Sequence, residues 1–213
     1  MKTDELITLL ATGAAPVPTH AAARRFALAM LWGLPGAVLL LLAALGVRGD
    51  LAQAAGTWMF WVKPAFAGSL ALAGWLAAER LARPGMRLGR LRAALAAPLL
   101  LLWLVAAYVL FDAAPAQRAG LVFGSSWKSC TLNIALVSLP LFAATFWAVK
   151  GLAPTRLMLA GSSAGFLAGS LGSLVYTLYC PESTLPFMAV WYVLGIAIPT
   201  LAGAMLGPRL LRW

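Results

Sequence analysis

The sequence has few of the residues from which catalytic and metal sites are usually built. Its 213 residues include one histidine, two cysteines and six acidic side chains, and charged residues make up 10% of the chain. It contains neither a C-x-x-C pair nor the four-ligand spacing of cysteine and histidine that is typical of a structural zinc site. Two cysteines are also too few for the disulfide framework of a small secreted domain. We therefore expect no enzymatic activity and no resident cofactor.

Hydrophobic residues, in contrast, make up 62% of the chain, and the mean hydropathy is +0.89. A soluble core of this size cannot bury so much apolar surface, so the composition indicates a membrane protein. The net charge of +10 would suggest nucleic-acid binding in a soluble chain, but here most basic residues separate hydrophobic runs. That placement is typical of membrane topology and of contact with anionic lipid. We expect membrane lipid, and no direct nucleic acid, as a partner.

Six stretches are apolar enough to cross a bilayer, which takes about 20 mostly apolar residues per helix. Because backbone groups in lipid must be hydrogen-bonded within the span, the sequence predicts an all-α integral membrane protein with six transmembrane helices. We place this domain at 27–206, between an N-terminal arm of residues 1–26 and a tail of residues 207–213. The six stretches are 27–47, 58–78, 93–113, 132–149, 157–178 and 186–206, and the candidate bends in them are Pro35, Pro98, Pro140 and Pro199.

The basic residues predict the orientation of these spans. Twelve of the sixteen lysines and arginines lie in the arm, the 79–92 and 150–156 connections and the tail, which all fall on one side of the membrane. Three others lie in connections on the opposite side. Positively charged connections stay in the cytoplasm, so both termini are predicted to be cytoplasmic.

The two cysteines then fall at the edges of hydrophobic runs on the outward side. Cys130 opens the fourth span in WKSCTLNIAL, and Cys180 follows the fifth span in YTLYCPES. Three interpretations remain open: a structural disulfide, a redox or soft-metal switch that uses the thiolates, and chance use of cysteine as an apolar residue.

Two features within the spans predict packing rather than chemistry. Among the ionisable residues, Lys63 is the one that lies well inside a hydrophobic run. We expect its long side chain to snorkel, so that the amino group reaches the outer interface. The fifth span carries Gly161, Gly165 and Gly169 at every fourth position, which predicts a closely packed central helix or a dimer face.

The N-terminal arm begins MKTDELITLLATGAAPVPTH. Thr3 can cap a short helix with acidic residues in its first turn, and the helix should end at Gly13. A helix of about nine residues is marginal alone in water, so it should fold either onto a partner's groove or onto the membrane surface. The aliphatic side chains that share one face are Leu6, Ile7 and Leu10.

Several segments of the chain resemble the NrsF family of membrane-embedded anti-sigma factors. They are MKTDELITLLA, WKSC, APTR, AGSSAGFLAG, YTLYCPESTLPFMAVWYVLGI and GAMLGPRLLRW, so the resemblance covers the whole chain. It implies a multi-pass protein of the bacterial inner membrane that sequesters an extracytoplasmic-function (ECF) sigma factor on the cytoplasmic side. It also implies that stress in the periplasm releases the sigma factor for transcription.

The resemblance further implies roles for particular residues. The paired outward cysteines of the family fall on Cys130 and Cys180, which would sense oxidants or heavy metals. The same two thiols are the candidate ligands for transient binding of a soft metal ion. Because the 114–130 loop and the CPES turn have no histidine or third cysteine, solvent or backbone would complete the metal's shell. The sigma-binding motif falls on Lys2, Thr3, Asp4, Glu5, Leu6 and Ile7, with Leu10 continuing its face.

A function of another class, a small transporter or a thiol-redox membrane protein, predicts different residues. Such a protein would carry ionisable side chains deep in several spans, or a C-x-x-C pair, and the sequence has neither. The glycine-rich face of the fifth span is compatible with packing inside one chain or between two chains, so the oligomeric state is left open.

Overall fold

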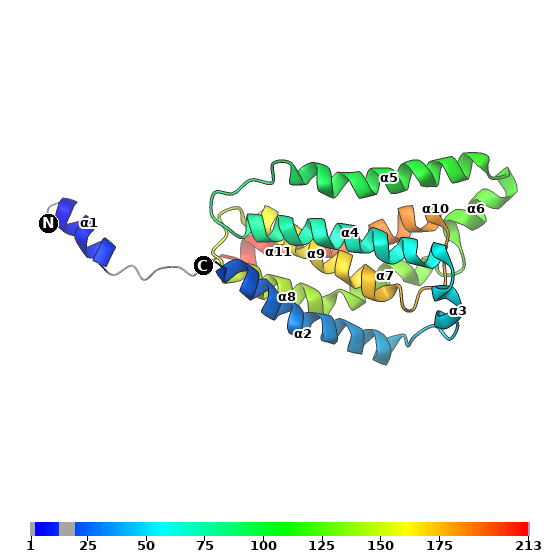
Figure 1. The fold of residues 1–213 in the computed structure, drawn as a ribbon, viewed down its shortest axis with the longest axis horizontal. Helices are drawn as coiled ribbons and strands as arrows, with labels where there is room; N and C mark the ends of the chain where they lie inside the picture. The colour runs from blue at the N-terminus through cyan, green and yellow to red at the C-terminus, as the bar shows by residue number, and fades with distance from the viewer. Residues whose placement is uncertain (1–2, 13–19, 213) are drawn as a thin grey trace.

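The computed structural model describes residues 3–12 and 20–212, which are mostly helical and contain no strand. The helices run lengthwise in a bundle, with α1 apart from it (Figure 1). They are α1 (Thr3–Thr12), α2 (Ala21–Ala44), α3 (Leu51–Ala55), α4 (Trp58–Leu81), α5 (Leu91–Asp112), α6 (Pro115–Phe123), α7 (Trp127–Val137), α8 (Leu139–Lys150), α9 (Leu157–Tyr176), α10 (Leu185–Phe187), the π-helix η1 (Met188–Tyr192) and α11 (Val193–Leu210).

Five helical segments in the described part of the chain are long and apolar enough to cross a membrane. They are Ala21–Ala44, Leu91–Asp112, Pro115–Lys150, Leu157–Tyr176 and Leu185–Leu210, and they match the first, third, fourth, fifth and sixth predicted spans. The second predicted span corresponds to α4, which has 24 residues but contains three charged residues, Lys63, Glu79 and Arg80. The six-span count therefore stays a prediction.

The region before the fourth span differs from the expected loop. Residues 114–131 were expected to connect two spans, whereas the structure forms α6 there and begins α7 at Trp127. Pro115 occupies the first turn of α6, where its missing N–H removes no helical hydrogen bond. Pro140 marks the division between α7 and α8, while Pro35, Pro98 and Pro199 lie inside continuous helices.

The glycine-rich helix α9 lies at the centre of the bundle, where it packs against α4, α8 and α11. A Cβ atom at Gly161 would collide with the carbonyl oxygen of Gly203, and one at Gly165 would collide with that of Pro199. The two backbones can approach closely because these positions lack side chains. The prediction of a central helix is confirmed, and the glycine face is covered by α11 of the same chain.

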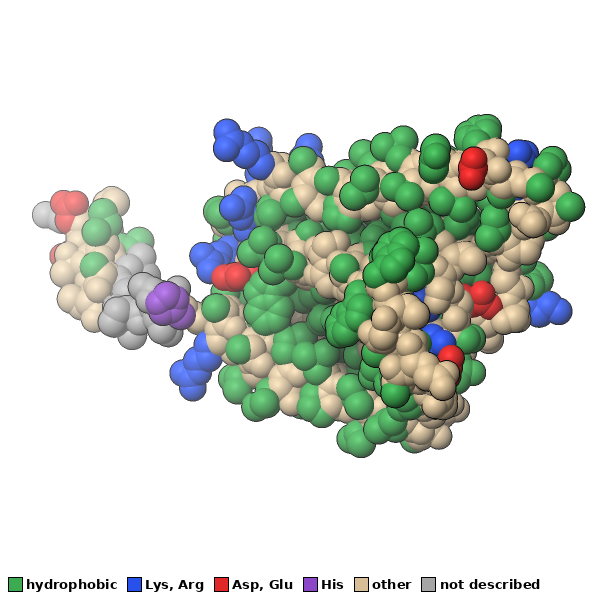
Figure 2. Space-filling model, turned by 45° about the vertical axis from the view of Figure 1, so that its right-hand side comes forward, with side chains coloured by type: hydrophobic (Ala, Val, Ile, Leu, Met, Phe, Trp, Pro, Cys, Tyr) green, Lys and Arg blue, Asp and Glu red, His purple; other side chains and the backbone are tan. Residues whose placement is uncertain are grey.

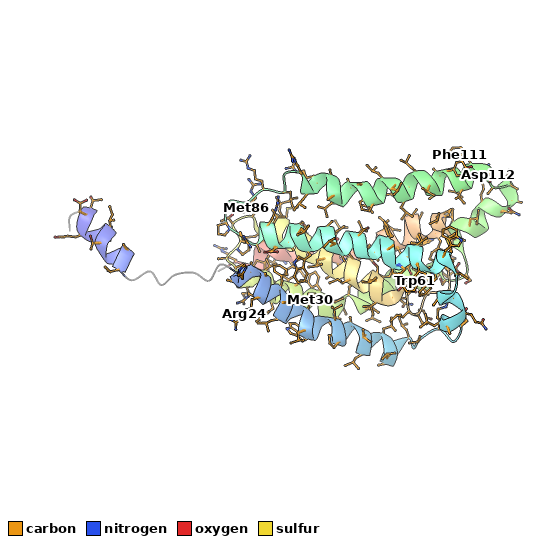
Figure 3. The ribbon with its side chains drawn as sticks, in the orientation of Figure 1. Arg24, Met30, Trp61, Met86, Phe111 and Asp112 are labelled. Carbon is orange, nitrogen blue, oxygen red and sulfur yellow. The ribbon has the colours of Figure 1, made fainter. Side chains whose placement is uncertain are left out.

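The two ends of the bundle carry different side chains. Most of its lysines and arginines gather at one end, which we call the basic end (Figure 2). The basic end comprises the start of α2, the 82–90 and 151–156 connections and the end of α11. The opposite end, which we call the thiol end, comprises residues 45–57, 112–130 and 177–185. Figure 3 shows Arg24 and Met86 at the basic end, and Trp61, Phe111 and Asp112 at the thiol end.

Candidate functional site

The two cysteines meet inside the thiol end of the bundle. Cys130 lies in the first turn of α7, and Cys180 follows the end of α9 at Tyr176. Both residues are 0% exposed, and their thiols lie beside each other without a disulfide bond. Residues fifty positions apart in the sequence are thus brought together by the packing of α7 against α9.

Two buried tyrosines complete this cluster of side chains. Tyr176 belongs to the last turn of α9 and Tyr192 to the π-helix, and their rings lie 6.0 Å apart between centroids. Both hydroxyl groups lie close to the two thiols, but neither has a hydrogen-bond partner of good geometry. Leaving a buried hydroxyl without a hydrogen bond costs about 1–3 kcal/mol. The two tyrosine hydroxyls can therefore still form hydrogen bonds inside an otherwise apolar cluster. We call Cys130, Cys180, Tyr176 and Tyr192 the thiol site.

Lys63 points into the protein rather than toward the membrane interface. Its side chain is 0% exposed, and Nζ donates a hydrogen bond to the carbonyl oxygen of Cys180 at 3.0 Å. The expectation that Lys63 snorkels to the interface is therefore wrong. Among the described residues, no side chain in the other spans offers Lys63 a partner. The backbone carbonyl is therefore the hydrogen-bond acceptor that offsets part of the cost of burying its amino group. Lys63 also places a positive charge beside both thiols.

Arg48 supports the same carbonyl oxygen from outside the spans. Its Nη1 donates to the oxygen of Cys180 at 3.1 Å, while Nε and Nη2 donate to the two carboxylate oxygens of Asp50 at 2.7 Å each. The hydrogen bonds from Arg48 lower the pKa of the Asp50 carboxyl below its usual value. The carbonyl oxygen of Cys180 thus accepts hydrogen bonds from two basic side chains, one on α4 and one in the connection between α2 and α3.

The stretch after Cys180 is tied to the turn between α6 and α7. Oε1 of Glu182 accepts hydrogen bonds from the backbone N–H of Ser125 at 2.7 Å and from the Ser125 hydroxyl at 2.6 Å. Oγ1 of Thr184 donates to the carbonyl oxygen of Leu121 at 2.9 Å. Because the turn leads directly into the helix that carries Cys130, these bonds fix the two cysteine segments relative to each other.

This arrangement suits chemistry of the thiol pair itself. Two adjacent thiols can form a disulfide, and the thiolate that attacks in such a step would lie beside the positive charge of Lys63. Within the described residues, no group of three or more His, Cys, Asp or Glu side chains is placed to hold a metal ion. A soft metal ion at Cys130 and Cys180 would thus need further ligands, such as the tyrosine hydroxyls or solvent.

The residues of the arm lie apart from the thiol site, on α1. The predicted short helix is confirmed, although it begins at Thr3 itself, so Thr3 is its first helical residue rather than its cap. Asp4 and Glu5 occupy its first turn, and Leu6 and Ile7 are 42% and 58% exposed. Of the other predicted contacts, Lys2 lies outside the described residues, and Leu10 is described by its helical backbone alone.

Sequence reasoning identified the cysteines but missed the residues that surround them. Tyr176 and Tyr192 read as ordinary aromatic residues in apolar helices, and Glu182 reads as a polar loop residue. Arg48 is one of the three basic residues in the connections on the outward side, and the sequence indicates only its place in the topology. Its Asp50 neighbour two positions away was the one local signal of a bidentate pair.

Comparison with known proteins places the chain among transcription regulators. Residues 10–213 match the protein family described as NrsF, negative regulator of sigma F. A protein of Azospira oryzae named "Probable anti-sigma-F factor NrsF" is 50% identical over 213 residues, which cover 100% of both chains. A protein of Caulobacter vibrioides named "Anti-sigma-F factor NrsF" is 42% identical over 215 residues, again covering 100% of both. No solved structure matches the chain.

Proposed function

The chain belongs to the NrsF family of negative regulators of sigma F, and from this membership we propose that it is a membrane-bound anti-sigma factor. Its proposed partner is a sigma factor of the ECF type. The arm holds this sigma factor on the cytoplasmic side of the inner membrane and so keeps it from RNA polymerase. Stress in the periplasm weakens the contact and releases the sigma factor.

The observation that carries this proposal is the character of α1. It is a ten-residue helix that exposes Leu6 and Ile7, with two acids in its first turn. Exposed aliphatic side chains on a short helix are typical anchors for a partner's hydrophobic groove. The other interpretation, a helix that lies on the membrane, calls for a basic polar face, and residues 3–12 contain no lysine or arginine.

The proposed topology has six spans, with both termini in the cytoplasm. Helix α4 is the second span: it packs along α9 in the bundle, and its buried Lys63 has a carbonyl partner. The basic end then faces the cytoplasm, in agreement with the retention of positive charge on that side. The thiol end faces the oxidising periplasm, where disulfides persist.

The thiol site is the proposed sensor. Hydrogen peroxide, as the oxidant, takes two electrons from the two thiols. The two S–H bonds and the O–O bond break, a bond forms between the sulfur atoms of Cys130 and Cys180, and two molecules of water leave. Alternatively, a soft metal ion displaces the two thiol protons and binds both sulfur atoms. Either reaction changes the packing where α7 and α9 meet.

A chain of contacts connects the sensor end to the arm. Helices α7 and α8 run from Cys130 to Lys150 at the basic end. There Nε of Arg25, on α2, donates to the carbonyl oxygen of Ala148 at 3.1 Å, and the guanidinium lies 4.5 Å from the ring centroid of Trp147. Since α2 begins at Ala21, inside the predicted arm of residues 1–26, a shift of α8 can move the base of the arm. The required coupling is modest, because a 100-fold loss of affinity corresponds to about 2.7 kcal/mol.

Capture of the partner tests the sequestration step. The tagged full-length chain, purified from membranes of its own bacterium in mild detergent, should retain a sigma factor identifiable by mass spectrometry. A chain that lacks residues 1–12 should lose it, because the proposed anchors are then absent. Absence of any sigma factor from the full-length sample, or equal recovery with the shortened chain, would contradict the proposal.

The sensing step is tested separately with Cys130→Ser and Cys180→Ser variants. Serine keeps the shape of the side chain and is only slightly smaller, but it cannot form a disulfide or bind a soft metal tightly. We expect both variants to keep the regulon silent and to lose most of its induction by peroxide or cadmium, measured by a transcriptional reporter. Ser126→Ala, which removes a neighbouring hydroxyl with no hydrogen-bond partner, is the control that should still respond. Normal induction in either cysteine variant would remove the thiol pair from the sensor.

A further inference from the structure

A groove in the side of the bundle lies next to the basic end. Its volume is about 370 Å³, within the range of small-molecule sites. It lies where α4 ends and where α5 and α9 begin, with one residue from α11. We call it the α5–α9 groove, and its lining includes Leu81, Arg92, Ala96, Leu159, Ser163 and Thr200.

The walls of this groove suit a hydrocarbon chain better than a polar molecule. Its three lining hydroxyls are directed to carbonyl oxygens of their own helices. Ser162 donates to Leu159 at 3.0 Å, Ser163 to Ala160 at 2.9 Å and Thr200 to Ile196 at 2.7 Å. With these donors used, the remaining wall is mostly aliphatic.

The 82–92 segment, which supplies Leu88 and Arg92 to the lining of the groove, is rich in arginine. Arg92 lines the groove directly, and Arg87 and Arg90 belong to the same segment. All three side chains are exposed, and no described carboxylate lies within ion-pair distance of them. Arg83 in the same segment differs, because its Nη2 pairs with Oε1 of Glu79 at 2.7 Å.

The outer surface of α5 places this groove beside the hydrocarbon of the membrane. Leu100, Leu101 and Leu104 of α5 are exposed, and Leu102 and Ala106 are the buried residues of this helix. Such a helix faces lipid over most of its surface. A groove between it and the bundle opens to acyl chains, while its mouth lies at the level of the headgroups of one leaflet.

We propose that the α5–α9 groove binds an anionic glycerophospholipid, with an acyl chain along the groove and its phosphate at Arg92, Arg87 and Arg90. Basic pockets between transmembrane helices on the cytoplasmic side commonly hold such headgroups. The guanidinium fork matches phosphate oxygens, which favours this ligand over a neutral lipid. The proposal rests on the membrane placement of the bundle and not on the binding of a sigma factor by α1.

Native mass spectrometry of the delipidated full-length chain tests this assignment. Phosphatidylglycerol and phosphatidylcholine with identical acyl chains are added separately. We expect the wild type to retain phosphatidylglycerol at least about tenfold more strongly than phosphatidylcholine, which corresponds to a difference of about 1.4 kcal/mol in binding free energy. Arg92→Gln should remove most of that preference. Arg118→Gln, the same charge change at the thiol end, should leave it intact.

Two further measurements separate the acyl chain from the phosphate. Ala96→Trp fills the groove without changing charge, and it should weaken retention of both lipids. Free glycerol 3-phosphate at the same concentration should not compete, because it has no acyl chain. Equal retention of the two lipids by the wild type, an unchanged preference in Arg92→Gln, or full competition by glycerol 3-phosphate would each overturn the proposal.

Discussion

Replacing Leu6 and Ile7 of α1 with alanine should leave the regulon of the proposed sigma factor transcribed in the absence of stress. Fully burying a leucine or isoleucine contributes about 1.5–3 kcal/mol, so the two truncations together should remove roughly 3 kcal/mol or more of binding. That corresponds to a loss of affinity of roughly 100-fold. A transcriptional reporter and the dissociation constant of the purified full-length variant for the captured sigma factor measure the effect.

The choice of alanine separates lost contacts from lost helix. Alanine has the highest helix propensity, so the variant does not weaken α1 itself. Thr8→Ala is the matched control: Thr8 lies on the opposite side of α1 from Leu6, and its hydroxyl donates to the Asp4 carbonyl within the same helix at 2.8 Å. The control should keep the regulon silent. Silence in the Leu6→Ala/Ile7→Ala variant would rule out sequestration through this face.

Replacing Gly165 with alanine should strongly destabilise the bundle. The new Cβ atom would lie 2.7 Å from the carbonyl carbon of Pro199 and 3.0 Å from Cα of Thr200. Both are backbone atoms of α11, so the contact can be relieved only by moving the two helices apart. Overpacking of this kind costs typically 1–3 kcal/mol, occasionally more. The free energy of unfolding in mixed detergent micelles, measured by titration with dodecyl sulfate, reports the loss.

Gly68→Ala provides the same chemical change without the collision. Gly68 lies inside α4, and an added Cβ would have no neighbouring atom within 4 Å. This variant should unfold at or above the wild-type midpoint, because alanine favours helix over glycine by about 1 kcal/mol. If Gly165→Ala and Gly68→Ala unfold alike, close backbone packing of α9 on α11 does not contribute to stability.

The hydrogen-bond partner of Lys63 could not be predicted from the sequence. Its position in a hydrophobic run predicted a snorkelling side chain, since no acidic residue lies deep in another span. The structure instead pairs Nζ with the carbonyl oxygen of Cys180, which is distant in the chain. Backbone carbonyls are present at every residue and leave no mark in the sequence, so a partner of this kind becomes visible only after the helices are packed.

Patterns that repeat within one helix predicted the structure correctly. The spacing of Gly161, Gly165 and Gly169 predicted a tightly packed helix, and the structure covers that face with α11. The acids of its first turn predicted a short helix in the arm, which α1 confirms, while the predicted end at Gly13 lies outside the described residues. By contrast, residues 114–131 were expected to be a loop. Their helical start is set by Pro115 and by contacts of α6 with α10, which is distant in sequence.

The sequence by itself determined the all-helical class, the greater part of the spans, the concentration of positive charge at one end and the short exposed helix of the arm. These properties depend on composition and on periodicity within single segments, where each residue's contribution is local. The tertiary structure alone decided that Cys130 and Cys180 are buried side by side, that two tyrosines and Lys63 surround them, and that Arg25 joins α2 to α8. These contacts join residues far apart in the chain, and their distances follow from how α7, α9 and α11 pack rather than from any one of the helices.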